Sequence, residues 1–190
     1  SNMCHESSGS GLSETLGIGK GSVALDDFNH ADLVIVIGQN PGTNHPRMLT
    51  ALKDTKKNGG KIMTINPLPE VGLMNYVDPQ NPLKWFGAGD KLTDLFLQVK
   101  INGDVALLKI ILKMMKAKEE KSGDVFNHQF IKEKTHGLED FLIDLDKYSI
   151  EELIPQTGLS LEVIKEATEM IISNDKIIIC WAMGLTQHKN

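Results

Sequence analysis

The sequence predicts an α/β fold: a Rossmann-like, three-layer α/β/α arrangement around a mostly parallel sheet. Three observations support this class. The run 32–37 is continuously apolar after its first residue and ends at Gly38, which is typical of a strand buried on both faces. A strand, a helix and a strand then follow one another over residues 32–65 and form one crossover unit. A second apolar run at 176–181 predicts another buried strand near the end of the sequence.

The first crossover unit has clear boundaries. A turn is expected over 38–44, because Gly, Asn and Pro dominate it, and a helix over 46–58 that Gly59-Gly60 closes. A short strand over 61–65 stops at Asn66-Pro67.

The middle of the chain is less regular. Residues 68–89, rich in Pro, Gly and Asn, predict an irregular excursion with one short helix, and residues 94–101 a third strand. Asn102-Gly103-Asp104 is expected to cap a helix over 105–121. The remaining helical segments are predicted at 127–134, 137–146 and 149–154, and from the N-cap Ser160 to Ser173.

Composition narrows the class of protein. The chain has 190 residues, a net charge of -5 and a pI near 5.7, with no basic footprint for nucleic acid. Its apolar runs are too short to span a membrane, so neither nucleic acid nor membrane is expected as a partner. Cys4 and Cys180 form neither a disulfide framework nor a zinc spacing, which favours a reducing cytoplasm. Ser1-Asn2 resembles a tag scar, and we expect a single domain over 4–190, a fragment of a longer chain.

Ligands of open α/β sheets bind beyond the carboxyl ends of the strands. Four segments are expected there, and they are rich in Asn, Thr, Asp, Gln and Gly, which suit hydrogen bonds to a nucleoside and its phosphates. Ordinary turns and helix caps explain the same residues equally well. Neither GxGxxG after a strand nor a P-loop is present, and no strand precedes the glycine-rich stretch 17–21. The four segments are 38–45, 65–68, 101–104 and 183–187.

The order of several motifs resembles the large subunits of molybdopterin oxidoreductases, nearest to formate dehydrogenase and its formate-dehydrogenase-like relatives. The resemblance runs from Cys4 to about His188. Its motifs are Cys4-His5-Glu6-Ser7-Ser8, Gly38-Gln39-Asn40-Pro41 with His45-Pro46, Gly60-Lys61-Ile62, Asn102-Gly103-Asp104 and Trp181-Ala182-Met183-Gly184-Leu185-Thr186-Gln187.

This resemblance implies a bis(molybdopterin guanine dinucleotide) cofactor with molybdenum, one guanosine diphosphate arm of which the domain would receive. Asn66 and Pro67 would face the guanosine, and Asp104 would accept hydrogen bonds from the guanine. Met183, Gly184 and Gln187 would reach toward the pterin. The phosphates and ribose would meet Gly38, Asn40, Thr43, Asn44 and His45.

The resemblance also implies a catalytic pair. Cys4 would ligate molybdenum in the parent protein, and His5 would handle the substrate proton. The parent would act on a small-molecule substrate with an electron-transfer partner, and an iron-sulfur cluster would lie upstream. The fragment alone is expected to be inactive, with Cys4 a frayed terminal residue.

The sequence departs from the family at two places. Asn66-Pro67-Leu68 replaces the common Asp-Pro-Arg, and the excursion from Leu68 is longer than in typical formate dehydrogenases, which favours the formate-dehydrogenase-like branch. Two alternatives stay open: a stand-alone nucleotide-binding or regulatory domain, and a structural module like the central domain of thiamine enzymes.

Overall fold

The computed structural model describes residues 5–76 and 89–188, and the chain falls into two compact units. The first comprises 1–98 and 174–190, and the second 99–173. Cys4 lies outside the described residues, as does most of the predicted excursion beyond position 76. None of the described helices combines the length and apolarity that crossing a bilayer requires. The single domain over 4–190 stays a prediction.

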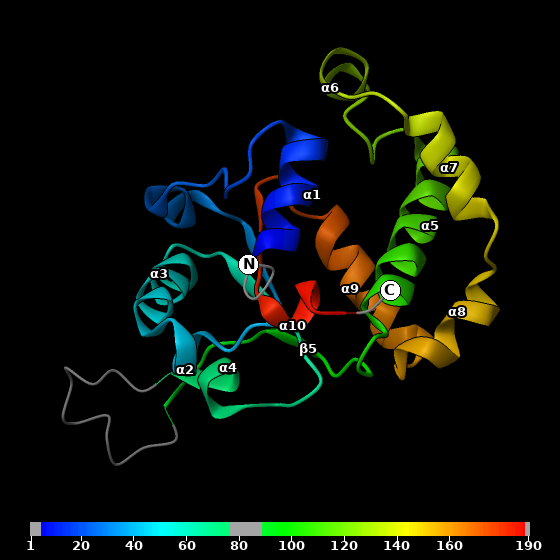
Figure 1. The fold of residues 1–190 in the computed structure, drawn as a ribbon. Helices are drawn as coiled ribbons and strands as arrows, with labels where there is room; N and C mark the ends of the chain where they lie inside the picture. The colour runs from blue at the N-terminus through cyan, green and yellow to red at the C-terminus, as the bar shows by residue number, and fades with distance from the viewer. Residues whose placement is uncertain (1–4, 77–88, 189–190) are drawn as a thin grey trace. The chain divides into compact units, whose positions relative to one another are not determined.

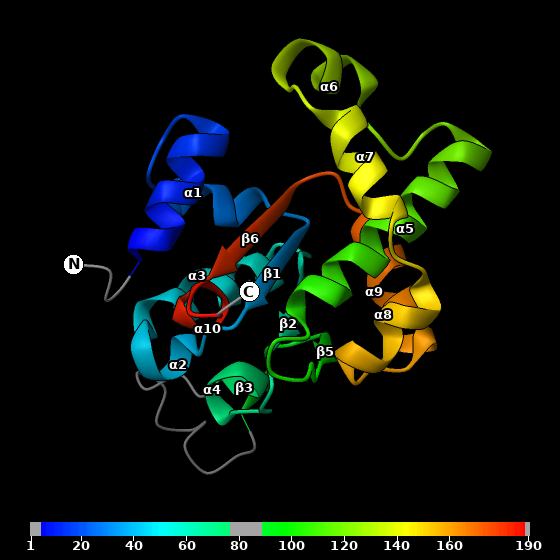
Figure 2. The same ribbon diagram turned by 45° about the vertical axis from the view of Figure 1, so that its right-hand side comes forward.

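The first unit is built on a four-stranded parallel sheet with the order β5-β2-β1-β6 (Figures 1 and 2). The Rossmann-like α/β class is therefore confirmed. The third strand is shorter than predicted, because only three of its residues pair with β2. The strands are β1 (Leu33–Ile37), β2 (Lys61–Ile65), β5 (Leu95–Leu97) and β6 (Ile177–Trp181).

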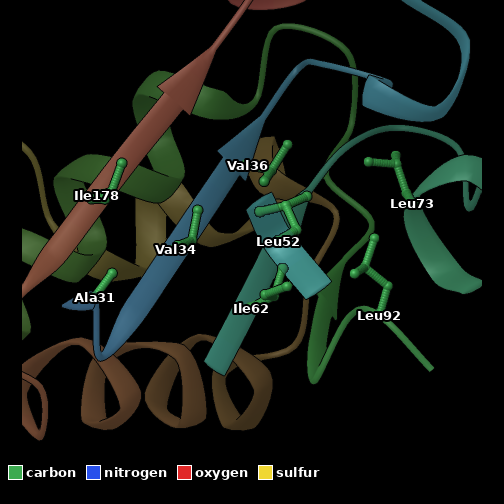
Figure 3. Close-up of a cluster of buried hydrophobic side chains, with 8 residues drawn as sticks. All are labelled: Ala31, Val34, Val36, Leu52, Ile62, Leu73, Leu92 and Ile178. Carbon is green, nitrogen blue, oxygen red and sulfur yellow. The ribbon is translucent and has the colours of Figure 1, made fainter. Parts of the chain in front are cut away.

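Both faces of β1 are buried, as its continuous apolar sequence predicts. On one face, Val34 lies beside Ile62 of β2 and Ile178 of β6, and Leu52 of α3 (Pro46–Lys57) packs over them (Figure 3). On the other face, Ile35 is 3 % exposed. Each such side chain contributes roughly 1.5–3 kcal/mol on burial. This core fixes the sheet from which the loops of the first unit project.

The last strand is less buried than predicted. In β6 only Ile178 is buried, and Ile179 is 50 % exposed. The strand lies at the edge of the sheet, where only one neighbour, β1, covers its main chain. An apolar run thus predicted the strand correctly but not its place in the sheet.

Short elements surround this sheet. The segment 38–44, predicted as a turn, contains helix α2 (Pro41–Asn44), and the excursion contains the one short helix expected, α4 (Val71–Met74). A small antiparallel pair, β3 (Asn75–Tyr76) and β4 (Asp90–Lys91), was not predicted. Further helices that the sequence did not predict are α1 (Glu6–Leu16), η1 (Leu25–His30) and α10 (Met183–Thr186).

The second unit is helical, and its long helix α5 (Asp104–Ser122) packs against three shorter helices, α7, α8 and α9. Leu107 and Ile110 of α5, with Ile164 of α9, are fully buried. The predicted helical segments are all present: α6 (His128–Lys134), α7 (Leu138–Asp146), α8 (Ile150–Thr157) and α9 (Leu161–Ile172).

The predicted cap at Ser160 is confirmed, since its side chain accepts a hydrogen bond from the Val163 N–H. Ser149, which was not predicted as a cap, forms a capping box with Glu152. At α5 the prediction was wrong in detail, since the N-cap is Gly103 and Asp104 is already the first helical residue. The chain turns there through Asn102, whose φ of 68° is one that Asn tolerates better than most residues.

The end of α5 is held by one carboxylate. Glu119, whose side chain is 13 % exposed, accepts hydrogen bonds from the Val125 and Phe126 N–H groups at 2.7 and 2.9 Å. Its other oxygen lies 2.5 Å from His128 Nε2. These contacts, first among them the one from Phe126, hold the pKa of Glu119 below its ordinary 4.5. The charged carboxylate therefore fastens the turn between α5 and α6.

Replacing Glu119 should weaken this turn in a pH-dependent way. A lowered folded pKa means that the carboxylate stabilises the fold above its unfolded pKa, and that this is lost as the pH falls through the folded value, below 4.5. Glu119→Gln should thus lower the urea midpoint at pH 7 and match the wild type at acid pH. Glu120→Gln, an exposed neighbour on the same helix, is the control. Equal midpoints for Glu119→Gln and wild type at pH 7 would contradict this role.

Candidate functional site

The carboxyl ends of β1, β2 and β6 lie abreast. Ile37 pairs with Ile65 on one side and Trp181 on the other, so the chain leaves the sheet on all three strands at the same level. Neighbouring strands are about 4.8 Å apart, which brings the three following loops within reach of one small ligand. From β1 the strand order runs to β2 and β5 on one side, whereas β6 pairs with β1 on the other side. The direction of strand order thus reverses between β1 and β6, and this place is the topological switch point of the sheet.

Two glycines touch at this switch point. Gly38 follows β1 with a φ of +57°, and a Cβ at Gly184 would lie 2.4 Å from the Gly38 carbonyl oxygen. A Cβ at Gly38 would lie 2.8 Å from the Leu185 nitrogen. No side chain fits between these main chains. The loops after β1 and β6 are thus locked together by direct contact of their backbones.

A second glycine contact lies one turn further along the first loop. A Cβ at Gly42 of α2 would lie 2.5 Å from the Gly72 Cα in α4, and a Cβ at Gly72 would lie 2.7 Å from Asn40 Oδ1. That Asn40 oxygen is buried and has no hydrogen-bond partner among the described residues. Buried polar atoms normally have a hydrogen-bond partner, so this oxygen can still accept a hydrogen bond from an N–H or O–H group.

The loop after β1 also orients a histidine. Gln39, only 9 % exposed, places Nε2 3.3 Å from His45 Nδ1 and 3.4 Å from Met48 Sδ. An amide N–H donates to Nδ1 only if the imidazole is neutral and carries its proton on Nε2. The exposed ring of His45 therefore presents an N–H donor, as do the side chains of other exposed residues of this loop, Thr43 and Asn44.

The loop after β2 is held by its own asparagine. The Asn66 N–H donates to the Leu97 carbonyl at 3.1 Å, and its side-chain amide donates to the Leu68 carbonyl at 2.8 Å. Gln98 also donates to the Pro67 carbonyl at 3.1 Å. Asn66 is 8 % exposed, so its donor shapes the loop. Pro67 is half-buried beside it.

The first unit thus brings together most of the predicted residues at one edge. Met183, Gly184 and Gln187 lie on or directly after α10, at the carboxyl end of β6. Asp104 belongs to the second unit, where it is 6 % exposed at the start of α5. His5 is the N-cap of α1.

A cavity of about 400 Å³ lies between α1, the stretch 19–23, η1 and β6. His5, Gln39 and Trp181 all line it. This cavity could not be predicted from the sequence, because α1 was not predicted and His5 lies far from Trp181 along the chain. No group of three or more His, Cys, Asp or Glu residues suited to a metal occurs within 5–76 and 89–188.

Cys180 forms part of the wall of this cavity and packs against the core cluster of the first unit. Burial raises the pKa of its thiol to about 11, because a thiolate is poorly solvated there. Cys180 is therefore protonated at neutral pH. The Cys180 side chain is half-buried. The side chains of His30, His128 and His136 are all exposed.

Two useful residues were not singled out by sequence reasoning. Gln39 is the polar residue immediately beyond the switch-point glycine, a position that could have drawn attention to it. Ser8 accepts a hydrogen bond from Trp181, which lies 173 residues later in the sequence, and no local sequence pattern could have revealed this contact.

The chain is similar to one segment of several longer proteins, although no family model matches it. It is 42% identical over 189 residues to an uncharacterised oxidoreductase of Mycobacterium tuberculosis, covering 99% of this chain and 24% of that protein. It is 26% identical over 185 residues to formate dehydrogenase H of Escherichia coli, covering 97% and 23%. The chain thus spans about a quarter of the length of the curated relatives it matches.

A solved structure has the same fold. Acetylene hydratase from Pelobacter acetylenicus superposes with a TM-score of 0.72 at 16% identity, over 95% of this chain and 21% of that one. At this identity the likeness concerns the fold alone.

Filling the glycine contact should disrupt the switch point. In Gly184→Ala the new methyl would meet the Gly38 carbonyl, which is backbone and cannot rotate away, so we expect a loss of about 1–3 kcal/mol in the free energy of unfolding. Urea unfolding measures it. Gly11→Ala is the control, because a Cβ there meets nothing within 4 Å and should stabilise α1 slightly. Wild-type stability of Gly184→Ala would show that the two main chains do not touch.

Cys180 should react slowly with alkylating agents. Only thiolates react, and a pKa of about 11 leaves roughly a hundredfold less thiolate at neutral pH than in an exposed cysteine. In a Cys4→Ser variant, where Cys180 is the one remaining cysteine, the rate with iodoacetamide should keep rising with pH up to about 11. Urea-unfolded protein is the control. A rate that levels off near pH 9 in the folded chain would contradict the raised pKa.

Proposed function

We propose that this chain, a segment of the oxidoreductases related to formate dehydrogenase H, holds one guanosine diphosphate arm of a bis(molybdopterin guanine dinucleotide) cofactor. The observation that carries the proposal is that β1, β2 and β6 end at the same level of the sheet, so the three loops that follow them start side by side. At the switch point between β1 and β6, Gly38 and Gly184 are in contact. Ligands of open α/β sheets occupy this place. Because glycine has no side chain, a ligand can approach the main chain of Gly38 and Gly184 closely.

The loop after β1 suits the phosphate and ribose side of such an arm. His45 presents an N–H donor, because Gln39 fixes its tautomer. Thr43 and Asn44 add an exposed hydroxyl and amide within the same short helix. Neutral donors of this kind bind phosphate oxygens and avoid the cost of burying a cation.

The guanosine side needs acceptors, since guanine presents an amino group and a ring N–H. The side-chain oxygen of Asn66 would be one such acceptor, because the amide nitrogen of Asn66 is used toward the Leu68 carbonyl. Asn66 and Pro67 would form the wall beside the base. Asn40 stays on the ribose side, where its buried oxygen, which has no partner among the described residues, would accept from a ribose hydroxyl.

The catalytic part of the proposal concerns the parent protein. When bound, the cofactor supplies two-electron redox chemistry at its molybdenum. Cys4 would be the thiolate ligand, and His5 at the start of α1 would accept a proton from a small substrate. We also propose that the isolated chain is inactive. A cytoplasmic location, an electron-transfer partner and an upstream iron-sulfur cluster belong to the same proposal.

Calorimetric titration of the 190-residue chain with GDP tests the nucleotide site. We expect saturable binding at least about tenfold tighter than that of ADP, a difference of ~1.4 kcal/mol, because adenine lacks the donors that guanine presents to an amide oxygen. Asn66→Ala should abolish the preference for GDP, and Asn44→Ala should weaken GDP and ADP alike.

The control is Glu162→Ala, which removes an exposed carboxylate from the first turn of α9 in the second unit. It should bind GDP as the wild type does. If GDP and ADP bind equally, the chain is a nucleotide-binding domain without guanine recognition, and if neither binds, the proposed site is wrong.

A further inference from the structure

Helix α1 is attached to the first unit in an unusual way. It begins directly after His5, and none of its residues is buried. Most helices in proteins are held by an apolar face packed against a core, and α1 lacks that anchor. Its position must therefore depend on a small number of specific contacts.

Two long-range hydrogen bonds supply these contacts, both in the first turn. Trp181 Nε1 donates to Ser8 Oγ at 3.1 Å, and Ser7 Oγ donates to the Thr186 carbonyl at 3.2 Å. Trp181 is the last residue of β6, and Thr186 is the last residue of α10. The first turn of α1 is thus fastened to the elements that flank the contact of Gly38 and Gly184 (Figure 2).

The rest of α1 does not close onto the sheet. Ser8, Gly9 and Leu12 line the cavity of about 400 Å³, whose opposite wall includes β6. The stretch after α1 folds back on the helix, since a Cβ at Gly19 would lie 2.6 Å from Ser13 Oγ. The two hydrogen bonds therefore join the first turn of α1 to β6 and α10, while the rest of the helix borders the cavity and the following loop.

We propose that Ser8 and Trp181 are positioning residues, whose hydrogen bond sets the start of α1, and with it His5, relative to the loop 183–187. This inference rests on the proposed function, in which His5 serves the reaction and Met183, Gly184 and Gln187 face the pterin. His5 precedes Ser8 by three residues, about one helical turn, so a shift at Ser8 is passed on to His5. A hydrogen bond depends on direction as well as distance, so the bond from the Trp181 indole to the Ser8 hydroxyl restricts both the position and the orientation of the first turn of α1.

Amide hydrogen exchange of the nucleotide-free chain tests the proposal. Ser8→Ala removes the acceptor, and Trp181→Phe removes the donor while keeping an aromatic ring. Each should speed exchange in α1 by about two- to tenfold, the effect of one net hydrogen bond. The double variant should exchange no faster than the single ones, because both remove the same bond.

Four further measurements separate positioning from a general loss of stability. Ser8→Thr keeps the hydroxyl and should restore slow exchange. Ser10→Ala, at an exposed position of the same helix, should behave as the wild type. The urea midpoint of Ser8→Ala should stay unchanged, since α1 buries no residue. The indole N–H resonance of Trp181 should shift in Ser8→Ala and return in Ser8→Thr.

The proposal is overturned if Ser8→Ala exchanges like Ser10→Ala, or if Ser8→Thr fails to rescue. A lowered urea midpoint for Ser8→Ala would also overturn it, because the serine would then support the whole fold. These measurements need no nucleotide. Failure of GDP to bind would remove the proposed function and leave the Ser8–Trp181 link standing, so the two results are distinguishable.

Discussion

The contact between Gly38 and Gly184 is the constraint on which the candidate site depends. It joins the exits of β1 and β6, two strands that are distant in sequence and adjacent in the sheet. Repulsion between backbone atoms is steep, so the distance between these loops has little freedom. The sheet supplies the force that holds them there, because β1 is buried on both faces and pairs along its full length with β2 and β6.

The chemistry at this edge is that of a binding site. The first-unit loops beyond the strands carry amides, hydroxyls and one imidazole. Gln39 is used to orient His45, and the Asn66 amide is used to shape its own loop. These groups suit the proposed polar ligand, because they offer hydrogen bonds in fixed directions. The group proposed to move a proton, His5, comes from a different element.

The sequence allowed much of the fold to be predicted, for reasons that are local. β1 and β2 are continuous apolar or β-branched runs, and α3 and α9 begin and end at Pro, Ser and Gly signals, so their bounds were nearly correct. The resemblance to formate-dehydrogenase-type oxidoreductases was confirmed by the relatives. Helix α1 was missed because its sequence, with two glycines and four serines, has weak helix propensity.

What could not be predicted depends on contacts between distant residues. The half-exposure of β6 follows from its place at the edge of the sheet, which an apolar run does not reveal. Asn40 is an ordinary turn residue in sequence, and only the approach of Gly72 buries its oxygen. The bond between Ser8 and Trp181 exists only once β6 has been placed beside β1.

The two halves of the candidate site are therefore fixed by different forces. Steric contact with Gly38 fixes the position of the loop that carries Gly184. This loop can be displaced toward Gly38 only if the backbone of the β1 loop also moves. Hydrogen bonds set the start of α1, and a net hydrogen bond is worth only about 1 kcal/mol, so they give direction but little stability. In this arrangement the loop after β6 is held by contact between main chains, while the element that carries His5 is held in place without adding to the core.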